Sequence, residues 1–300
     1  MARALVLYNP IAGSGQTDIK ERLSELVPDE TVFCDMTKAE AYEKDILSMG
    51  ADDYIIVCGG DGTLNRFANK ISTLNIENDI LYFPCGSGND FARELGKQRE
   101  DAPFSVKKYI ERLPTVTING NSSLFINGVG YGIDGYCCEV GDKERATSTK
   151  PVNYTAIAIK GLLFHYKPTN AKVTVDGKTF EYKKVWIAPT MNGKYYGGGM
   201  MPTPEQNRLS PDGKLSVMVF HGSGALKTLM IFPSLFKGEH IKHTKYVTVH
   251  EGYDITVEFD SPRTVQVDGE TTLGVSAYTA RSARNANLND GVEKVAATAE

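Results

Sequence analysis

Hydrophobic residues in the first third of the chain form short apolar runs, and residues with helical spacing follow each run. We expect strands at Ala4–Tyr8, Thr31–Cys34, Tyr54–Cys58 and Ile80–Phe83, and helices over residues 17–26, 38–47, 64–71 and from Asn89 onward. Compact apolar runs of this kind are typical of strands that are buried on both faces of a parallel sheet. The alternating order therefore predicts a doubly wound α/β domain with right-handed crossovers.

From about residue 115 the pattern changes to short runs, many of them alternating, which indicate a mostly β region. We expect strands at Val116–Ile118, Ser123–Val129, Ala171–Val175, Lys184–Pro189, Leu215–Phe220, Lys245–His250, Ile255–Phe259 and Thr264–Val267, with helical inserts at Val152–Phe164 and Ala225–Phe236. Asp176-Gly177 lies between two alternating runs and predicts a hairpin turn. The change predicts two domains, residues 1–118 and 119–300, with residues 284–300 as a flexible polar tail.

The composition is that of a globular protein, with 41% hydrophobic and 23% charged residues in 300. The formal charge of −4 argues against a general nucleic-acid partner and means that any contact with an anionic membrane must be local. The five cysteines are odd in number and form no C-x-x-C pair, which favours reduced thiols in a cytoplasmic protein. No apolar stretch approaches the roughly 18 residues of a spanning helix, so we expect no integral membrane segment.

Three glycine-rich loops follow three of the expected strands in the first domain. They are Asn9–Gly15, Gly59–Thr63 and Cys85–Asp90. Glycine at one strand-to-helix turn often only relieves steric strain, but ligands of a doubly wound sheet bind outside the carboxyl ends of its strands. Three such loops at one crevice therefore indicate a binding site for phosphate groups.

Gly59-Gly60-Asp61-Gly62-Thr63 carries the strongest chemical signal. Adjacent glycines let backbone N–H groups approach phosphate oxygens, and Thr63 can cap the helix that follows. Asp61 would repel a phosphate unless Mg²⁺ lay between the two, so its presence indicates a metal–nucleotide site. Asp90 in the third loop has a simpler alternative, because a carboxylate at a helix start complements the helix dipole. Neither a P-loop nor the dinucleotide fingerprint G-x-G-x-x-G is present in these loops.

With these loops the sequence resembles the diacylglycerol kinase catalytic domain family, in its bacterial lipid kinase branch. The resemblance rests on Gly59–Thr63 and on Pro84-Cys-Gly-Ser-Gly-Asn-Asp-Phe-Ala-Arg93, and it continues through Gly128–Asp134, Gly197–Gly199, Pro211–Gly213 and Val267–Glu270. The G-G-D-G-T element alone is shared with phosphofructokinases and NAD kinases, whereas the N-D-F-A-R segment is more specific. The resemblance implies an α/β nucleotide domain and a β-sandwich domain with ATP in the cleft between them.

The resemblance also implies roles for residues at the matching positions. For the Mg²⁺–ATP site these are Asn9, Gly59, Gly60, Asp61, Gly62, Thr63, Gly86, Ser87, Asn89, Asp90, Arg93 and Lys160, with Asp61 at the metal. Asp268 matches the general base that accepts the proton of the attacking hydroxyl, and Glu270 lies beside it. Asp212 matches a ligand of a structural metal in the second domain. Without the resemblance, Asp268-Gly269 would be interpreted as a hairpin tip and Lys160 as a side chain that extends to solvent.

Two positions depart from the family pattern. The family commonly has N-E after the threonine, where this chain has Asn65-Arg66, and it usually has D-G-x-[LF]-D at the structural metal, where Ser216 replaces the second acid. Both changes remove a carboxylate, and the second weakens a Mg²⁺ cage. An NAD kinase-like enzyme and a catalytically weakened nucleotide-binding module are therefore the alternatives.

The resemblance predicts an ATP-dependent lipid kinase that phosphorylates the hydroxyl of diacylglycerol or a related lipid. Its partners are then ATP and a lipid substrate at a membrane surface, and its location is cytoplasmic and peripheral at the membrane. The apolar residues of the helical insert Val152–Tyr166 could line a groove for that lipid or pack in the core. The identity of the lipid and the oligomeric state are left open, with a homodimer among the alternatives.

Overall fold

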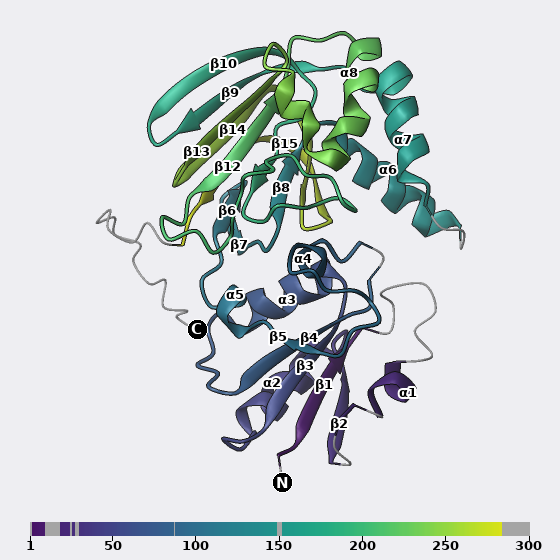
Figure 1. The fold of residues 1–300 in the computed structure, drawn as a ribbon, viewed down its shortest axis with the longest axis vertical. Helices are drawn as coiled ribbons and strands as arrows, with labels where there is room; N and C mark the ends of the chain where they lie inside the picture. Colours follow the sequence, from purple (N-terminus) through teal and green to yellow (C-terminus); the bar gives the residue numbers. More distant parts are fainter. Residues whose placement is uncertain are drawn as a thin grey trace, which may run out of the picture.

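The computed structural model contains two domains stacked along the long axis of the molecule (Figure 1). It describes residues 2–9, 19–24, 26–27, 30–86, 88–148 and 152–283. The first domain is built on a five-stranded sheet and the second on a ten-stranded sheet. Among the described residues, no helix is long and apolar enough to span a bilayer.

The first sheet is parallel apart from one short edge strand. Its order is β2-β1-β3-β4-β5, with β1 at Ala4–Tyr8, β2 at Thr31–Asp35, β3 at Tyr54–Gly59, β4 at Asp79–Pro84 and β5 at Phe104–Ser105. Only the pairing of β5 with β4 is antiparallel. The four expected strands are confirmed to within a residue at each end, because fully buried apolar runs give a strong signal.

Helices cover both faces of this sheet, which confirms the doubly wound arrangement. They are α1 (Ile19–Ser24), α2 (Ala39–Leu47), α3 (Asp61–Ile71), α4 (Asp90–Glu94) and α5 (Lys107–Ile110). Leu64 and Phe67 of α3 pack in one buried cluster with Ile55, whereas Leu23 of α1 packs in another with Ile56. Ile55 and Ile56 are successive strand residues and point to opposite faces, so the two clusters lie on opposite sides of the sheet.

The second domain is antiparallel and folds its sheet around a core. The strands are β6 (Thr115–Ile118), β7 (Asn121–Leu124), β8 (Gly128–Tyr131), β9 (Thr169–Val175), β10 (Lys178–Val185), β11 (Thr190–Met191), β12 (Leu215–Phe220), β13 (Val247–Gly252), β14 (Asp254–Val267) and β15 (Glu270–Arg281). Their main path is β13-β12-β11-β8-β14-β15-β6-β7, and β9 joins β10 to β14. β6 belongs to this sheet, although the sequence placed it at the end of the first domain.

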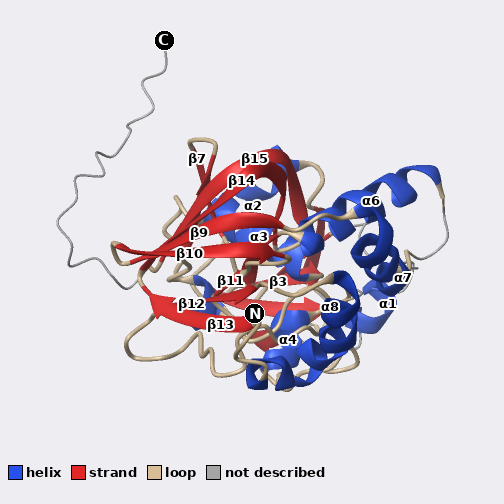
Figure 2. Cartoon of the chain, turned by 90° about the horizontal axis from the view of Figure 1, so that it is seen from above, coloured by secondary structure: helices blue, strands red, loops and turns tan. Residues whose placement is uncertain are grey.

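A layer of helices covers one side of the second sheet. It consists of α6 (Ile133–Thr147), α7 (Tyr154–Lys160), the π-helical turn η1 (Gly161–His165), α8 (Ala225–Ile231) and the 3₁₀ segments η2 (Phe232–Lys237) and η3 (Glu239–Lys242). Ile157 and Leu162 pack against Trp186 and Phe220 of the β layer. Figure 2 shows the helices α6, α7 and α8 gathered on one side of the strands.

Several details of the second domain differ from the sequence-based expectations. The expected strand Ser123–Val129 is two strands, because the backbone between β7 and β8 turns out of the ladder to donate hydrogen bonds to Asp268. The runs Ile255–Phe259 and Thr264–Val267 form one irregular strand, β14. The strand expected at Lys184–Pro189 is wrong in its bounds, because β10 covers Lys178–Val185 and residues 186–189 lie outside the strands. β15 and α6 had no clear periodic signal. The Asp176-Gly177 hairpin is confirmed, with φ of 48° and 81°.

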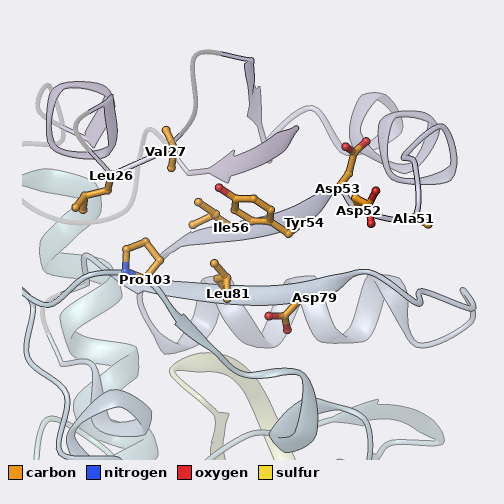
Figure 3. Close-up of a pocket in the computed structure, with 10 residues that line it drawn as sticks. All are labelled: Leu26, Val27, Ala51, Asp52, Asp53, Tyr54, Ile56, Asp79, Leu81 and Pro103. Carbon is orange, nitrogen blue, oxygen red and sulfur yellow. The ribbon is translucent and has the colours of Figure 1, made fainter. Parts of the chain in front are cut away.

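A hollow of about 330 Å³ lies at the amino end of the parallel strands (Figure 3). Tyr54 and Asp79, the first residues of β3 and β4, line it together with Leu26 and Pro103. The glycine loops follow the carboxyl ends of the same strands, so this hollow lies away from them. The candidate site for phosphate groups lies at the opposite edge of the sheet.

Candidate active site

The two described glycine loops touch each other through their backbones. A Cβ atom on Gly86 would lie 2.4 Å from the Cα of Gly60, and one on Gly60 would lie 3.2 Å from the Cα of Gly86. The amide of Cys85 also donates to the carbonyl of Gly59 at 2.8 Å. Any side chain at Gly86 would force the loops apart, so the glycines are required by this close approach.

Asp61 joins the first of these loops to the helix that follows the second. Its carboxylate accepts the backbone N–H groups of Asp90 at 2.7 Å and Phe91 at 3.1 Å, so it satisfies two free donors at the start of α4. Burial raises the pKa of Asp61, and these hydrogen bonds act in the opposite direction. Asp61 thus has a structural task in addition to the metal–nucleotide role expected from the sequence.

Asn89 and Asp90 shape the second loop. The Asn89 backbone is left-handed, with φ of 47°, and its side chain bonds the N–H and the carbonyl of Gly86 at 3.0 and 2.8 Å. Asp90 is buried; its Oδ2 accepts the N–H of Gly198 at 2.7 Å, and its Oδ1 has no partner among the described residues. Burial, followed by the nearby charge of Asp61, raises the pKa of Asp90 to about 7.

Asp268 lies on the turn between β14 and β15, with a left-handed φ of 47°. Its Oδ1 accepts the N–H groups of Asn127 (2.8 Å) and Gly128 (3.1 Å). Its Oδ2 accepts the N–H of Ile126 (2.5 Å) and the side-chain amide of Asn65 (2.8 Å). Burial raises the pKa of Asp268 to about 6, against the effect of these donors. The carboxylate is therefore held in one orientation by groups from both domains.

The turn that carries Asp268 faces the first glycine loop. A Cβ atom on Gly62 would lie 3.4 Å from the carbonyl oxygen of Asp268 and 3.7 Å from Oε1 of Glu270. Glu270 is exposed and forms a loose ion pair with Arg66, at 3.8 Å from Oε1 to Nε. The structure thus brings Gly62 close to Asp268 and Glu270, which lie about 200 residues later in the chain.

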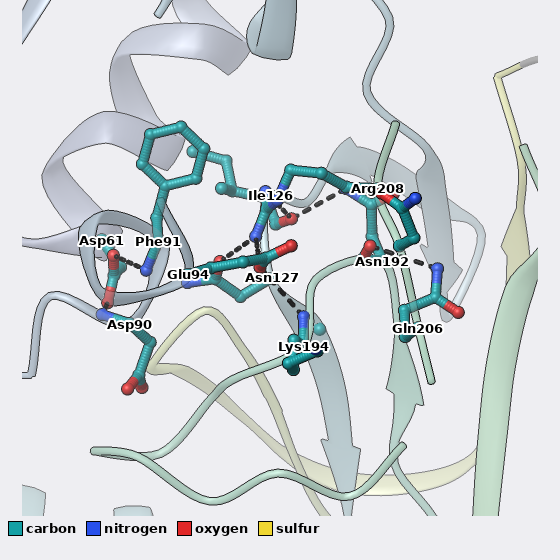
Figure 4. Close-up of polar contacts among 12 residues, drawn as sticks. Asp61, Asp90, Phe91, Glu94, Ile126, Asn127, Asn192, Lys194, Gln206 and Arg208 are labelled. Atoms are coloured by element: carbon teal, nitrogen blue, oxygen red, sulfur yellow. Dashed lines mark hydrogen bonds and ion pairs between the residues drawn. The ribbon is translucent and has the colours of Figure 1, made fainter. Parts of the chain in front are cut away.

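A buried ion pair fixes the two domains beside this site (Figure 4). The Arg208 side chain is only 3% exposed, and its Nη2 lies 2.5 Å from Oε2 of Glu94 at the end of α4. Arg208 also donates to the carbonyl of Ile126 (3.1 Å) and to Oδ1 of Asn127 (3.0 Å). These contacts hold residues 126–127, whose N–H groups bind Asp268. No sequence motif identified Arg208, because its partners come from distant segments.

The other residues expected at the nucleotide site have different surroundings. Asn9 is buried just after the end of β1, and Thr63 is buried in the first turn of α3. Arg93 is exposed beside Gly199, where a Cβ would lie 2.5 Å from its Nη1. Lys160 is exposed on α7, and no hydrogen bond or ion pair joins it to the glycine loops in the part of the chain that the structure describes. Ser87 and most of the loop Asn9–Gly15 lie outside the described residues.

The turn at Asp212 does not fit the structural metal that the resemblance implies. Asp212 is largely exposed, accepts hydrogen bonds from Ser210 and Lys214, and pairs with Nζ of Lys214 at 3.5 Å. Ser216 is buried and donates its hydroxyl to Gln206 instead of supplying a second carboxylate. A lysine ammonium occupies the surroundings that a cation would need, so we assign no metal to Asp212.

Asp61 and Asp90 fit a divalent ion that arrives with a nucleotide. A Cβ atom on Gly88 would lie 3.9 Å from Oδ2 of Asp90 and 4.0 Å from Oδ2 of Asp61, so the two carboxylates face the same space. The unpartnered Oδ1 of Asp90 and the mutual repulsion of the two groups would both be relieved by a cation. No cluster of three or more His, Cys, Asp or Glu ligands occurs among the described residues, so phosphate oxygens would complete the shell.

Comparisons with known proteins agree with this architecture. Residues 3–117 match the family model of the diacylglycerol kinase catalytic domain, and residues 127–286 match that of the YegS C-terminal NAD kinase beta sandwich-like domain. The Staphylococcus aureus (strain MSSA476) protein named "Putative lipid kinase SAS0691" is 27% identical over 263 residues, which cover 84% of this chain and 80% of that protein.

Solved structures from Bacillus anthracis strain Sterne share the fold. One, named as a diacylglycerol kinase, has a TM-score of 0.63 at 24% identity and covers 94% of both chains. Another, named as a "putative diacylglycerol kinase", has a TM-score of 0.64 at 21% identity with the same coverage. These likenesses confirm the α/β domain followed by an antiparallel, sandwich-like domain.

Proposed function

Because the chain belongs to the family that joins a diacylglycerol kinase catalytic domain to a YegS-type C-terminal domain, we propose that it is an ATP-dependent lipid kinase. It would transfer the γ-phosphoryl group of ATP to the hydroxyl of diacylglycerol or a related lipid. The observation that carries this proposal is the meeting of the Gly59–Thr63 loop, the Gly86–Asp90 loop and the Asp268 turn at one edge of the sheet.

The nucleotide phosphates would lie over the two glycine loops. Gly60 and Gly62 carry no side chain that would keep phosphate oxygens from their backbone N–H groups, whereas the N–H of Gly86 already donates to Oδ1 of Asn89. Thr63, Asn89 and Arg93 lie in or beside these loops in the sequence, and Asn9 follows β1. Asp61 and Asp90 would hold the Mg²⁺ of Mg²⁺–ATP, whose charge offsets that of the phosphates. Lys160 keeps its proposed role near the phosphates only through the family resemblance.

Asp268 would act as the general base. In the reaction the acceptor oxygen forms a bond to the γ-phosphorus, the bond from that phosphorus to the β–γ bridging oxygen breaks, and ADP leaves with that electron pair. The hydroxyl proton moves to the Asp268 carboxylate. Of the four donors on that carboxylate, only the Asn65 amide belongs to a side chain, so it is the donor that a hydroxyl can displace. Glu270 lies beside the same turn.

An apolar surface on the second domain supports a membrane-bound acceptor. The three most exposed large apolar side chains among the described residues are Phe164 (75%), Leu226 (72%) and Met230 (75%). Phe164 lies on η1, which packs beside α8 with Leu226 and Met230, and Figures 1 and 2 show these segments together. Such side chains can enter the interface of a bilayer.

The charge around this surface is complementary to anionic lipid. Residues 152–168 and 221–238 contain Lys160, Lys167, Lys227 and Lys237 but no aspartate or glutamate, although the whole chain carries a formal charge of −4. Lysine near an anionic surface adds to the binding provided by buried apolar area. We therefore propose peripheral attachment through this face, defined by Phe164, Leu226, Met230, Lys167, Lys227 and Lys237.

Two measurements test the proposed function. The label of γ-³²P-ATP should be transferred to a lipid in mixed micelles and not to NAD. Equal labelling of NAD would favour the NAD kinase alternative, and no transfer to any acceptor would favour a nucleotide-binding module.

The second measurement tests the membrane-binding face. The amount of protein that sediments with anionic vesicles should fall at least about tenfold when Leu226 and Met230 are both changed to Ser. Leu47→Ser, at an equally exposed position on α2, is the matched control and should sediment like the unchanged protein.

A further inference from the structure

A cleft of about 620 Å³ lies at the junction of the two domains, on the flank of the Asp268 turn. One wall is α3, a second is the β6–β7 hairpin, and a third is the start of β15 with the end of β14. Glu270 lines the cleft, and so does Asn65, whose amide binds Asp268. The cleft therefore opens beside the group proposed as the base.

Most of the side chains that line this cleft carry a polar group. α3 contributes Asn65, Arg66, Asn69 and Lys70, and the hairpin contributes further amide and hydroxyl side chains, while only Ile118 and Val267 are aliphatic. An acyl chain placed over Arg66 would remove its exposed guanidinium from water without giving it a new partner, which is unfavourable. The Arg66 side of the cleft therefore suits a polar group of an acceptor.

Some polar side chains of the cleft are held by hydrogen bonds within the protein, whereas Arg66 is exposed and can bind a ligand. The amides of Asn65 and Asn69 both donate to the carbonyl of Leu124, and Asn69 accepts the N–H of Leu124, so these side chains fix α3 to β7. Arg66 differs from them. Its side chain is 58% exposed, and its one ion pair among the described residues is the 3.8 Å contact with Glu270.

Arg66 has the chemistry of a phosphate-binding group. Its planar guanidinium offers donors that match two phosphate oxygens at once, and Lys70 lies one helical turn further on α3, on the same face. Lys70 is already paired, because its Nζ lies 2.7 Å from Oε1 of Glu43, so Arg66, with its loose 3.8 Å contact to Glu270, is the cation of this wall that a phosphate can engage.

We propose that this cleft binds the phosphate of an acceptor lipid that carries both a phosphate group and a free hydroxyl. Arg66 holds the phosphate, with Lys70 beside it, and the hydroxyl of the same head group reaches Asp268 on the other side of Asn65 and Glu270. This inference rests on the proposed lipid kinase function and names its substrate class. It distinguishes the chain from an enzyme for neutral diacylglycerol.

The test compares two acceptors that differ at the 3-position, which carries a phosphate in one and a free hydroxyl in the other. 1-Oleoylglycerol 3-phosphate and 1-oleoylglycerol are presented to the full chain in the same non-ionic micelles, with glycerol 3-phosphate as a soluble third acceptor. We expect the phosphate-bearing lipid to have the higher kcat/KM. Arg66→Glu should lower kcat/KM for that lipid at least about tenfold and leave the rate with 1-oleoylglycerol and the KM for ATP unchanged. Arg112→Glu, an exposed arginine outside the cleft, carries the same charge change and should have no effect.

The outcomes separate the possible failures. If no lipid is labelled at all, the proposed function fails together with this inference. If both lipids are labelled equally well and Arg66→Glu changes neither, the lipid kinase stands and the phosphate site is wrong. An Arg66→Glu effect confined to the KM for ATP would also overturn the site, because the cleft would then serve the nucleotide. If glycerol 3-phosphate is labelled as well as 1-oleoylglycerol 3-phosphate, the cleft binds a phosphate group, but the proposal that the acceptor is a lipid is overturned.

Discussion

Asp268 and Asp212 both lie on turns of the second domain, yet their surroundings are opposite. Asp268 accepts four hydrogen bonds from residues of both domains, whereas Asp212 accepts bonds only from Ser210 and Lys214 of its own turn. Burial raises the pKa of Asp268 to about 6, and hydrogen bonds lower that of the exposed Asp212. An aspartate at a matching sequence position therefore indicates a function only when its neighbours are also in place.

The largest effect on stability is expected from the buried contacts beside Asp268. Arg208→Met leaves the Glu94 carboxylate buried without its partner, which should lower the free energy of unfolding by about 3–5 kcal/mol. Lys214→Met removes the exposed partner of Asp212 and should change it by less than about 1 kcal/mol. Urea unfolding of both variants measures the difference. Equal effects of the two substitutions would contradict the contrast between the two regions.

The next largest effect is expected on nucleotide binding, from a substitution of Asp61. Asp61→Asn should weaken Mg²⁺-dependent ATP binding by about 10–100-fold, because the carboxylate proposed to bind the metal is replaced by a neutral amide. The amide oxygen can still accept one of the two N–H groups of α4, so most of the fold should be kept. Calorimetric titration with ATP, with and without Mg²⁺, checks this. Unchanged Mg²⁺-dependent binding would remove Asp61 from the metal site.

These contacts also mark what the sequence could and could not predict. The buried strands Ala4–Tyr8 and Leu215–Phe220 were predicted at their observed bounds, because continuous apolar runs are local signals. The strand Ser123–Val129 was mispredicted, since its interruption depends on Asp268, about 140 residues away. The glycine loops were visible as motifs, and their function came from the resemblance. Arg208 was missed because a buried ion pair between distant segments leaves no periodic pattern.

A smaller effect is expected from pH. Asp268 must be ionised to accept a proton, so kcat at saturating Mg²⁺–ATP should fall about tenfold per pH unit below about 6. The pH dependence of stability has the opposite sign to that of kcat. The pKa of Asp268 is higher in the folded protein than its ordinary value of 3.8, so its contribution to stability improves as the pH falls from about 6 toward 4. A rate that is lost below pH 6 only together with the fold would contradict this assignment.

The smallest effect is expected at Asp212. Asp212→Ala removes hydrogen bonds within one exposed turn and no metal ligand, so the free energy of unfolding should change by less than about 0.5 kcal/mol. Addition of millimolar Mg²⁺ in the absence of nucleotide should leave the Tm of the unchanged protein where it is. A metal-dependent rise in Tm that Asp212→Ala abolishes would restore the structural metal to this turn.

The central claim is that Asp268 is the base of a phosphoryl transfer, and kcat of a matched pair of variants tests it most directly. Asp268→Asn and Asp212→Asn are compared with γ-³²P-ATP at saturating Mg²⁺–ATP and micellar lipid, after calorimetry has shown that both bind the nucleotide. We predict that Asp268→Asn lowers kcat at least about a hundredfold and that Asp212→Asn leaves it within a factor of about two. A folded, nucleotide-binding Asp268→Asn protein with nearly unchanged kcat would contradict the mechanism.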